Sequence, residues 1–380
     1  MGYILNEDQK SLVKLTQDFC EREVKPYVAE WDRDGIFPLQ TYKKAMALGF
    51  HMMEIPEKYG GAGVDMITTA ACMEEFGRVC GGFAATMLSI SLSLKPVIMN
   101  GTPEQIQKFV DVLVNCRFTA FALTEPNAGS DAGAVRTTAV REGDEYIING
   151  SKCFITTSAY ADILIVFAST DRSKGSKGLS AFIVESNRPG MTIGKHEDKM
   201  GIRASSTSEV FFDNLRIPAS NLIGKEGDGF KIAMQTLDLA RPLVGAAAVG
   251  MAQHAIDVAA AYSKGRIQFG KPIANLQAIQ FMLADMEIGT ETARQSVVHA
   301  LNLYEAKLPF SREAAIAKCY ATDVAYTTAG NAVQILGGYG YSREYPVEKI
   351  LRDAKIYQIF EGTNQIQRIV IAGQVLKRYK

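Results

Sequence analysis

The sequence has no net charge, few histidines and no clustered cysteines. Its 41 lysines and arginines balance 41 aspartates and glutamates, whereas nucleic-acid-binding proteins usually carry a basic excess. The four histidines are not clustered and the six cysteines form no C-x-x-C motif, which favours neither a zinc site nor a disulfide framework. These absences predict a protein with no bound metal and no nucleic-acid partner, in a reducing compartment that we take to be the cytoplasm.

The sequence also lacks a long apolar run and a leader. The longest apolar run, residues 83–94, is shorter than the roughly 20 residues that cross a bilayer and is closed by Lys95. We interpret it as a buried helix, and we assign no functional role to Lys95. The first residues show no basic region followed by an apolar one, so the sequence predicts no secretory signal and no membrane association.

What is present is the composition of a soluble enzyme, with 380 residues, 47% apolar and 22% charged. Apolar residues recur at helical spacing from residue 7 to about residue 109, and short β-rich runs separated by turn residues follow from Arg117, with a hairpin turn at residues 142–144. Helical spacing returns after Gly229, with a break or kink near Pro242. The sequence therefore predicts an α+β chain of three domains. They are an N-terminal helical domain (1–116), a middle antiparallel β domain (117–228) and a C-terminal helical domain (229–380).

Two glycine-rich segments resemble phosphate-binding loops without their structural setting. Residues 265–271 begin like a P-loop, but Pro272 stands where that motif needs a serine or threonine, and no buried strand precedes it. Residues 337–340 lack the strand, loop and helix order of a dinucleotide-binding turn. The sequence therefore supports neither a P-loop nor a Rossmann domain.

Two other segments could bind a ligand or be ordinary structure. Residues 123–131 place hydroxyls, an amide and flexible backbone N–H groups at the end of a β run, where a plain turn is the simpler interpretation. Residues 154–157 end another strand with a phenylalanine and two threonines, which could pack on a flat heterocycle or simply belong to the core. The residues alone leave both choices open.

A carboxylate near the C-terminus has two interpretations. Glu361 precedes Gly362 and a helix that starts with Thr363 or Asn364 as its N-cap, and Gln367 fits a capping box in the second case. Glu361 could be a surface carboxylate favoured by the helix dipole. It could instead lie in an apolar setting, where desolvation raises its pKa from about 4.3 and makes it a better base.

Together these segments, in their order and spacing, resemble the acyl-CoA dehydrogenase family of flavoproteins over essentially the whole chain. The resemblance implies a C-terminal four-helix bundle, a homotetramer, FAD in each subunit, and α,β-dehydrogenation of an acyl-CoA with electrons passed to electron-transfer flavoprotein. The segments that carry it are Leu123–Asp131, Lys152–Thr157, Arg266–Gly270 with Gln277, and Ile359–Asn364; Asp198–Gly201 looks like bacterial butyryl-CoA members, and Ala240–Val244 and Tyr345–Lys349 like medium-chain members.

The resemblance also implies residue roles. Glu361 matches the base that takes the α proton while the β hydrogen leaves as hydride to flavin N5. The residues that match substrate contacts are Ser130, Asp238, Arg241 and Gly362. Those that match FAD contacts, some of them from a neighbouring subunit, are Phe121, Leu123, Thr124, Ser130, Phe154, Thr156, Thr157, Arg266, Phe269, Gln277, Gln334, Gly337, Gly338, Thr363 and Gln365.

Two differences from relatives narrow the choice of base and of acyl group. Ala240 stands where long-chain relatives place their base, which leaves Glu361 as the candidate, and Ala84 stands where glutaryl-CoA relatives place an arginine. The resemblance thus implies a monocarboxylic acyl group of about four to eight carbons or a compact ring, bounded by large side chains in residues 87–94 and 237–244. A flavin oxidase or monooxygenase on the same fold, and a non-catalytic DNA-associated relative, stay as alternatives.

Overall fold

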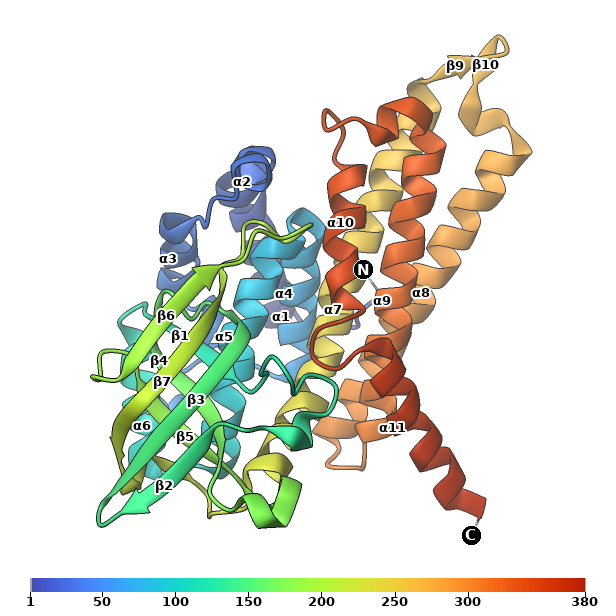
Figure 1. Ribbon diagram of the computed structural model, residues 1–380. Helices are drawn as coiled ribbons and strands as arrows, with labels where there is room; N and C mark the ends of the chain where they lie inside the picture. Colours follow the sequence, from blue (N-terminus) through green and yellow to red (C-terminus); the bar gives the residue numbers. More distant parts are fainter. Residues whose placement is uncertain (1, 380) are drawn as a thin grey trace.

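The computed structural model describes residues 2–379 and shows a helical N-terminal part, a central β-sheet and long C-terminal helices (Figure 1). Side-chain caps explain where three N-terminal helices begin, since Asn6, Asp65 and Thr102 each accept a hydrogen bond from the third backbone N–H of the helix that follows. The predicted order of helical, β and helical parts is confirmed. The N-terminal helices are α1 (Glu7–Phe19), α2 (Val28–Asp34), α3 (Leu39–Ala47), α4 (Met66–Val79), α5 (Gly81–Asn100) and α6 (Pro103–Val114).

The central sheet has the strand order β6-β7-β3-β2-β4-β5-β8, with β1 beside β4. The predicted turn at residues 142–144 is confirmed, because β2 and β3 pair antiparallel around it. The sheet is antiparallel as predicted, apart from β1, which runs parallel to β4, and one parallel residue pair between β2 and β4. The long connection through residues 123–160 makes the parallel pairing of β1 with β4 possible. The strands are β1 (Phe118–Ala122), β2 (Thr138–Glu142), β3 (Glu145–Thr156), β4 (Ala161–Ser169), β5 (Leu179–Glu185), β6 (Met191–His196), β7 (Thr207–Pro218) and β8 (Leu222–Ile223).

The C-terminal part is built around two long helices that pack on each other, α7 and α9. The sequence predicted a break or kink in α7 at Pro242, but the helix continues unbroken through it, and residues 239–252 around the proline are buried. Burial on both sides outweighs the one backbone hydrogen bond that proline removes. The elements are α7 (Gly229–Gly265), the hairpin β9 (Ile267–Gln268) and β10 (Lys271–Pro272), α8 (Gln277–Glu305), α9 (Ser311–Leu336), α10 (Val347–Tyr357) and α11 (Asn364–Leu376).

Two helices, α5 and α7, are long and apolar enough to cross a membrane by length and composition. Within the protein, however, 89% and 72% of their most apolar windows are buried. Core helices of soluble proteins meet the same criteria, so these two helices are weak evidence for a membrane. The helix predicted over residues 83–94 is thus confirmed and extends to Gly81–Asn100.

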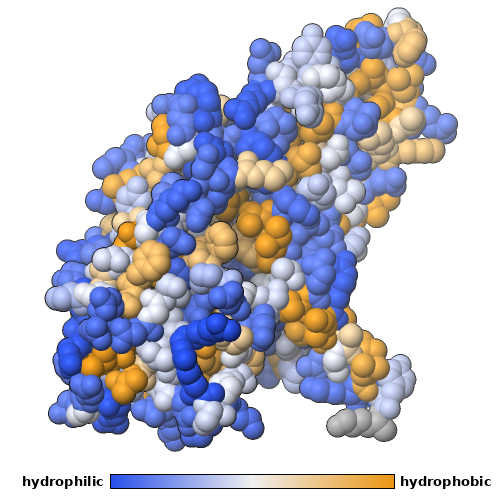
Figure 2. All heavy atoms as spheres, viewed as in Figure 1, coloured by the Kyte–Doolittle hydropathy of each residue, from blue (hydrophilic) through white to orange (hydrophobic). Residues whose placement is uncertain are grey.

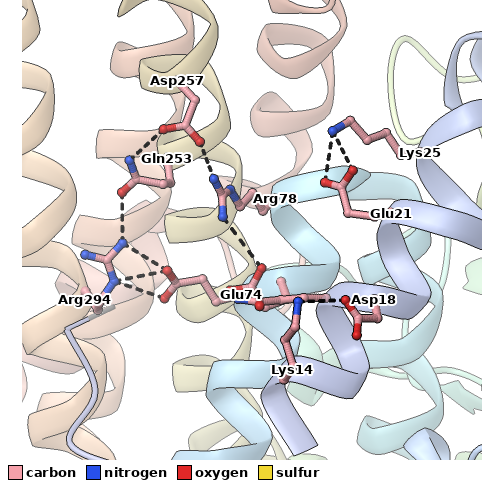
Figure 3. A network of polar contacts seen from close by, with 11 residues as sticks. Lys14, Asp18, Glu21, Lys25, Glu74, Arg78, Gln253, Asp257 and Arg294 are labelled. Atoms are coloured by element: carbon pink, nitrogen blue, oxygen red, sulfur yellow. Dashed lines mark hydrogen bonds and ion pairs between the residues drawn. The ribbon is translucent and has the colours of Figure 1, made fainter. Parts of the chain in front are cut away.

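A buried polar network joins the N-terminal and C-terminal helices (Figure 3). The guanidinium of Arg294 on α8 donates to the Glu74 carboxylate on α4 at 3.0–3.2 Å and to Gln253 on α7 at 3.2 Å. Arg78 on α4 donates to Asp257 on α7 at 2.6 Å. Both Glu74 and Arg294 are almost fully buried, so their charges depend on each other.

We expect Glu74→Gln to lower the free energy of unfolding by about 2 kcal/mol, because it removes the buried carboxylate that binds the Arg294 guanidinium and leaves only the half-exposed Glu291 as its counter-charge. Thermal melting of the purified protein checks this, and the melting temperature should fall by several degrees. The control is Asp18→Asn in the exposed Lys14–Asp18 pair, which should leave the melting temperature almost unchanged. Equal melting temperatures for Glu74→Gln and the wild type would contradict this account.

Candidate functional site

Glu361 lies on the turn between α10 and α11, and its backbone is left-handed. Its φ is +53°, and that of Gly362 is +89°. A left-handed non-glycine residue costs about 1–3 kcal/mol and persists only where its surroundings hold it. The Thr363 hydroxyl accepts the Ile366 N–H at 3.2 Å, so Thr363 is the N-cap of α11, one of the two positions that the sequence left open.

Two buried side chains, Lys318 and Gln367, donate hydrogen bonds to this turn. The Lys318 ammonium on α9 donates to the Gly362 carbonyl at 2.8 Å and to Asn364 Oδ1 at 2.9 Å. The Gln367 amide donates to the same carbonyl at 2.9 Å and to the Glu361 carbonyl at 3.3 Å. The sequence alone indicates no role for Lys318, because no local pattern shows that α9 packs against residues 361–364.

The Glu361 carboxylate is buried and incompletely hydrogen-bonded. Its Oε2 atom has no hydrogen-bond partner within residues 2–379. Burial raises the pKa of Glu361 to about 7, and the positive charges of Lys95, Lys318 and Arg241 oppose that rise. The carboxylate therefore lies in a desolvated setting, as the second sequence interpretation required, and can exchange a proton near neutral pH.

Lys95, which had no role in the sequence analysis, belongs to this electrostatic environment. Its ammonium donates to the Glu54 carboxylate and to the Ser91 hydroxyl, both at 2.6 Å. Lys95 is 3% exposed, so Glu54 supplies the counter-charge that burial requires. Through Lys95, the N-terminal domain contributes a positive charge to the surroundings of Glu361.

Helix α7 supplies another side of the site through Asp238 and Arg241. Their side chains form an ion pair, and Arg241 is almost fully buried. The Arg241 guanidinium lies beside Gly362, since a Cβ on that glycine would be 4.0 Å from Arg241 Nη2. Arg241 Nε and Glu361 Oε2 are both buried without partners in the part of the chain that the structure describes. Such unpaired atoms in one place indicate a polar ligand.

An apolar cluster distinct from the main core lies next to this polar group. Leu92 on α5 and Leu237 and Ala240 on α7 form it, with Phe121 and Met234 packed against it. The sequence could not fix the helix phase of the predicted pocket floor. The structure places Leu92 and Leu237 in the cluster, whereas the other predicted floor residues belong to the main core: Met87, Leu88 and Leu94.

In the middle domain, the loop at residues 123–131 is anchored by a buried ion pair. Glu125 accepts hydrogen bonds from the Thr137 N–H at 2.9 Å and from Lys152 Nζ at 2.8 Å, and Lys152 also donates to the Leu123 carbonyl at 3.0 Å. The loop is thus held rigidly, while Thr124 is half-buried and Ser130 is exposed. The sequence analysis assigned no function to Glu125 or Lys152.

Residues 154–157, which could pack on a flat heterocycle, have one exposed aromatic ring and one hydroxyl that is already hydrogen-bonded within the domain. Phe154 is 65% exposed with φ +57°. The Thr157 hydroxyl donates to the Thr119 carbonyl at 2.8 Å, so it serves the domain itself. Thr156, which is only partly buried, is the hydroxyl of the pair that remains for a ligand.

A second site lies at the far end of α7. A cavity of about 690 Å³ is lined by Arg266, Gly337, Gly338 and neighbours, with the Arg266 guanidinium 5.6 Å from the centre of the Tyr339 ring. The structure therefore brings three predicted residues together here. The other predicted residues of this group are exposed and do not line the cavity: Phe269, Gln277, Gln334 and Gln365.

Three family models match the chain in consecutive segments. Residues 6–116 match "Acyl-CoA dehydrogenase, N-terminal domain", residues 120–215 match the middle domain, and residues 227–376 match the C-terminal domain. Together these segments cover most of the chain.

Known proteins are similar over the full length. The chain is 47% identical to "Acryloyl-CoA reductase (NADH)" of Anaerotignum propionicum, covering 100% of this chain and 97% of that protein. It is 45% identical to "Acyl-CoA dehydrogenase, short-chain specific" of Clostridium acetobutylicum, covering 99% and 100%.

Solved structures share the fold. Butyryl-CoA dehydrogenase of Megasphaera elsdenii matches with a TM-score of 0.96 and 46% identity, covering 99% of this chain and 100% of that chain. A chain from a structure described as the electron transferring flavoprotein of Acidaminococcus fermentans matches with the same values. An acyl-CoA dehydrogenase from Bacillus anthracis, solved in complex with FAD, matches with a TM-score of 0.91 and 35% identity, covering 98% of this chain and 69% of that chain.

The raised pKa of Glu361 predicts a pH-dependent stability. Because the carboxyl titrates near 7 in the folded protein and near 4.3 when unfolded, the stability that its neutral form contributes is full below about pH 4 and lost as the pH rises through 7. Glu361→Gln carries no charge and escapes that loss. Its melting temperature relative to the wild type should therefore be higher at pH 8 than at pH 5. A difference that does not change with pH would contradict the buried carboxylate.

Proposed function

The chain belongs to the acyl-CoA dehydrogenase family, and on that premise we propose that it dehydrogenates a short-chain acyl-CoA between the α and β carbons, with Glu361 as the base. The observation that carries the proposal is the buried, unpaired Oε2 of Glu361 on a strained turn beside Arg241. Enzymes of this family depend on FAD, and an FAD complex of a relative is known. The flavin is therefore the cofactor.

Glu361 has two groups suited to the thioester. Its carboxylate is desolvated, with its pKa raised to about 7, so it accepts a proton more readily than an exposed glutamate does. Its backbone N–H donates no hydrogen bond within residues 2–379. That N–H is free to bind the thioester oxygen while the carboxylate takes the α proton, which is the arrangement of an oxyanion hole.

The described residues fit a flavin at the edge of the middle domain. Phe154 offers an exposed ring, Thr156 a hydroxyl, and the loop anchored by Glu125 offers backbone N–H groups. When bound, FAD supplies the acceptor for the two electrons that leave with the β hydrogen. We propose that its ring is held by Phe121, Leu123, Thr124, Ser130, Phe154 and Thr156, with Thr157 fixing the strand end, and its distal part by Arg266, Phe269, Gln277, Gln334, Gly337, Gly338, Thr363 and Gln365.

Arg266 and Thr363, both proposed for the distal part of FAD, lie far apart in one chain. Thr363 follows Gly362, which lies beside Arg241 of α7, whereas Arg266 caps the C-terminal end of that helix, about 37 Å along it from Arg241. Apolar side chains are also exposed around the β9–β10 end, where Phe269 is 90% and Phe281 60% exposed, and Figure 2 shows apolar surface there and along α8. These features support a homotetramer in which a neighbouring subunit completes the distal part of the FAD site.

Electron-transfer flavoprotein is the proposed redox partner, supported by the similarity to a chain from the Acidaminococcus fermentans structure. The relative from Anaerotignum propionicum favours a second candidate function, reduction of an enoyl-CoA at the same residues. Both directions use the same proton transfer at Glu361. We further propose that the enzyme is cytoplasmic and divides into domains at residues 1–116, 117–228 and 229–380.

We expect Glu361→Gln to keep FAD but lose nearly all flavin reduction by butyryl-CoA, because an amide keeps the shape of the side chain and cannot accept the α proton. Anaerobic stopped-flow bleaching of the flavin measures this. The matched control is the exposed Glu104→Gln, which should reduce at the wild-type rate. Adding Ala240→Glu to Glu361→Gln should restore weak activity, since Ala240 lies in the neighbouring apolar cluster.

Wild-type rates in Glu361→Gln would disprove the assignment of the base. Rapid stoichiometric peroxide formation by the reduced wild-type enzyme in air would indicate an oxidase instead of a dehydrogenase.

The apolar cluster predicts a short acyl group. Leu92 and Leu237 limit the pocket, and each buried methylene adds only about 0.8 kcal/mol, so kcat/KM should differ little between neighbouring chain lengths and fall once the chain meets these side chains. Glutaryl-CoA should be poor, because Ala84 offers no counter-charge for a buried carboxylate. Comparing butyryl, octanoyl, palmitoyl, cyclohexanecarbonyl and glutaryl thioesters measures this, and a maximum at palmitoyl or glutaryl would show the pocket to be different.

A further inference from the structure

Lys318 on α9 is a buried lysine that has no carboxylate in hydrogen-bond contact within residues 2–379. Its relative exposure is 0%, and its two hydrogen bonds go to the Gly362 carbonyl and Asn364 Oδ1. Other buried lysines of this protein, such as Lys152 and Lys349, donate directly to a carboxylate. Burying an ammonium group costs free energy unless a counter-charge is close by. The position of Lys318 next to the Glu361 turn therefore indicates a function there.

The side chain of Asn364 makes the support beneath the turn rigid. While its oxygen accepts from Lys318, its amide donates to the Thr322 hydroxyl at 2.9 Å and to Asp323 at 2.7 Å. The amide of Gln358, at the end of α10, also donates to Asp323 at 2.7 Å. The ammonium of Lys318 is therefore held in one position relative to both helices that flank Glu361.

We propose that Lys318 is a positioning residue for the reaction: its ammonium fixes the Gly362 carbonyl below the strained turn and provides an immobile positive charge for the Glu361 carboxylate. This inference rests on the proposed function, because it gives Lys318 a purpose through Glu361. The hydrogen bonds orient the carboxylate, and the charge favours its ionised, proton-accepting form.

The charges around the two groups agree with this role. Burial lowers the pKa of Lys318 to about 7, and Glu361 is the first of the charges that oppose the lowering, with Cys319 and Asp323 also opposing it and Arg241 adding to it. Around Glu361, the cations are Lys95 on α5, Lys318 on α9 and Arg241 on α7, and Tyr357 on α10 is the neutral titratable group. Each member of the Lys318–Glu361 pair favours the charged form of the other.

The test compares Lys318→Met and Lys318→Gln with the wild type as FAD-loaded enzymes. Methionine removes the charge and the donors, whereas glutamine keeps one donor without the charge. Anaerobic flavin reduction by butyryl-CoA is measured from pH 5.5 to 9. Without the cation the pKa of Glu361 rises, so the midpoint of the rate profile should move up by about one pH unit in both variants, with a rate loss of about tenfold at pH 6.5. Glutamine should retain more rate than methionine at high pH.

The control is Lys349→Met, which removes another buried lysine, one paired with Asp353, and should lower the melting temperature without moving the midpoint. Variants that bind FAD and keep the wild-type midpoint would overturn the proposal, as would failure of both Lys318 variants to fold or bind FAD, since Lys318 would then serve folding alone.

A readout without turnover separates this inference from the proposed function. The melting temperatures of proteins with Glu361 and with Glu361→Gln are compared across the pH range, once with Lys318 and once with Lys318→Met. The pH at which the two melting temperatures begin to differ should be higher when Lys318 is replaced by methionine. If the wild-type flavin is not reduced by any acyl-CoA, the proposed function fails, and this melting series alone decides whether Lys318 acts on Glu361. An unmoved melting response would overturn the role of Lys318.

Discussion

The burial of one carboxylate on a left-handed turn is the constraint on which the site depends. Glu361 lies on the turn between α10 and α11, and its left-handed backbone conformation is rare for residues other than glycine. Burial drives its pKa upward, and three cations from three different helices drive it back. The balance leaves a carboxylate that is desolvated and yet able to ionise near neutral pH, as the proposed base must be. A less buried carboxylate would be a weaker base, and one without cations would stay protonated.

The architecture follows from bringing those cations together. Helix α5 carries Lys95, α7 carries Arg241 and α9 carries Lys318, so the N-terminal and C-terminal parts must pack closely, as the buried Glu74–Arg294 pair ensures. The sheet then presents the loop at residues 123–131 and the strand end at Thr156. In Figure 2 apolar surface gathers in the hollow between the sheet and the C-terminal helices, which is where we propose that the flavin and the acyl chain bind.

Local patterns in the sequence indicate the three-part order, the turn at residues 142–144 and a helix start at Thr363 or Asn364, because apolar periodicity and caps are local properties. They do not show that β1 pairs parallel with β4, because that pairing joins segments far apart in the sequence. The kink predicted at Pro242 does not form, because burial of α7 outweighs the tendency of proline to break a helix. Lys318, Glu125 and Lys95 bind partners that lie 27 to 44 residues away in the sequence, and only the folded chain shows such pairings. The family resemblance pointed to Glu361 as the base but not to the residues that hold it.

The most direct test of the central claim is a crystal structure of the enzyme with FAD and an unreacted short-chain acyl-CoA. If Glu361 is the base, one of its carboxylate oxygens should lie about 3–3.5 Å from the α carbon of the thioester. The Glu361 N–H should donate to the thioester oxygen, and the β carbon should face the flavin. A thioester bound away from the Glu361 turn, or a Glu361 carboxylate turned outward to solvent in that complex, would contradict it.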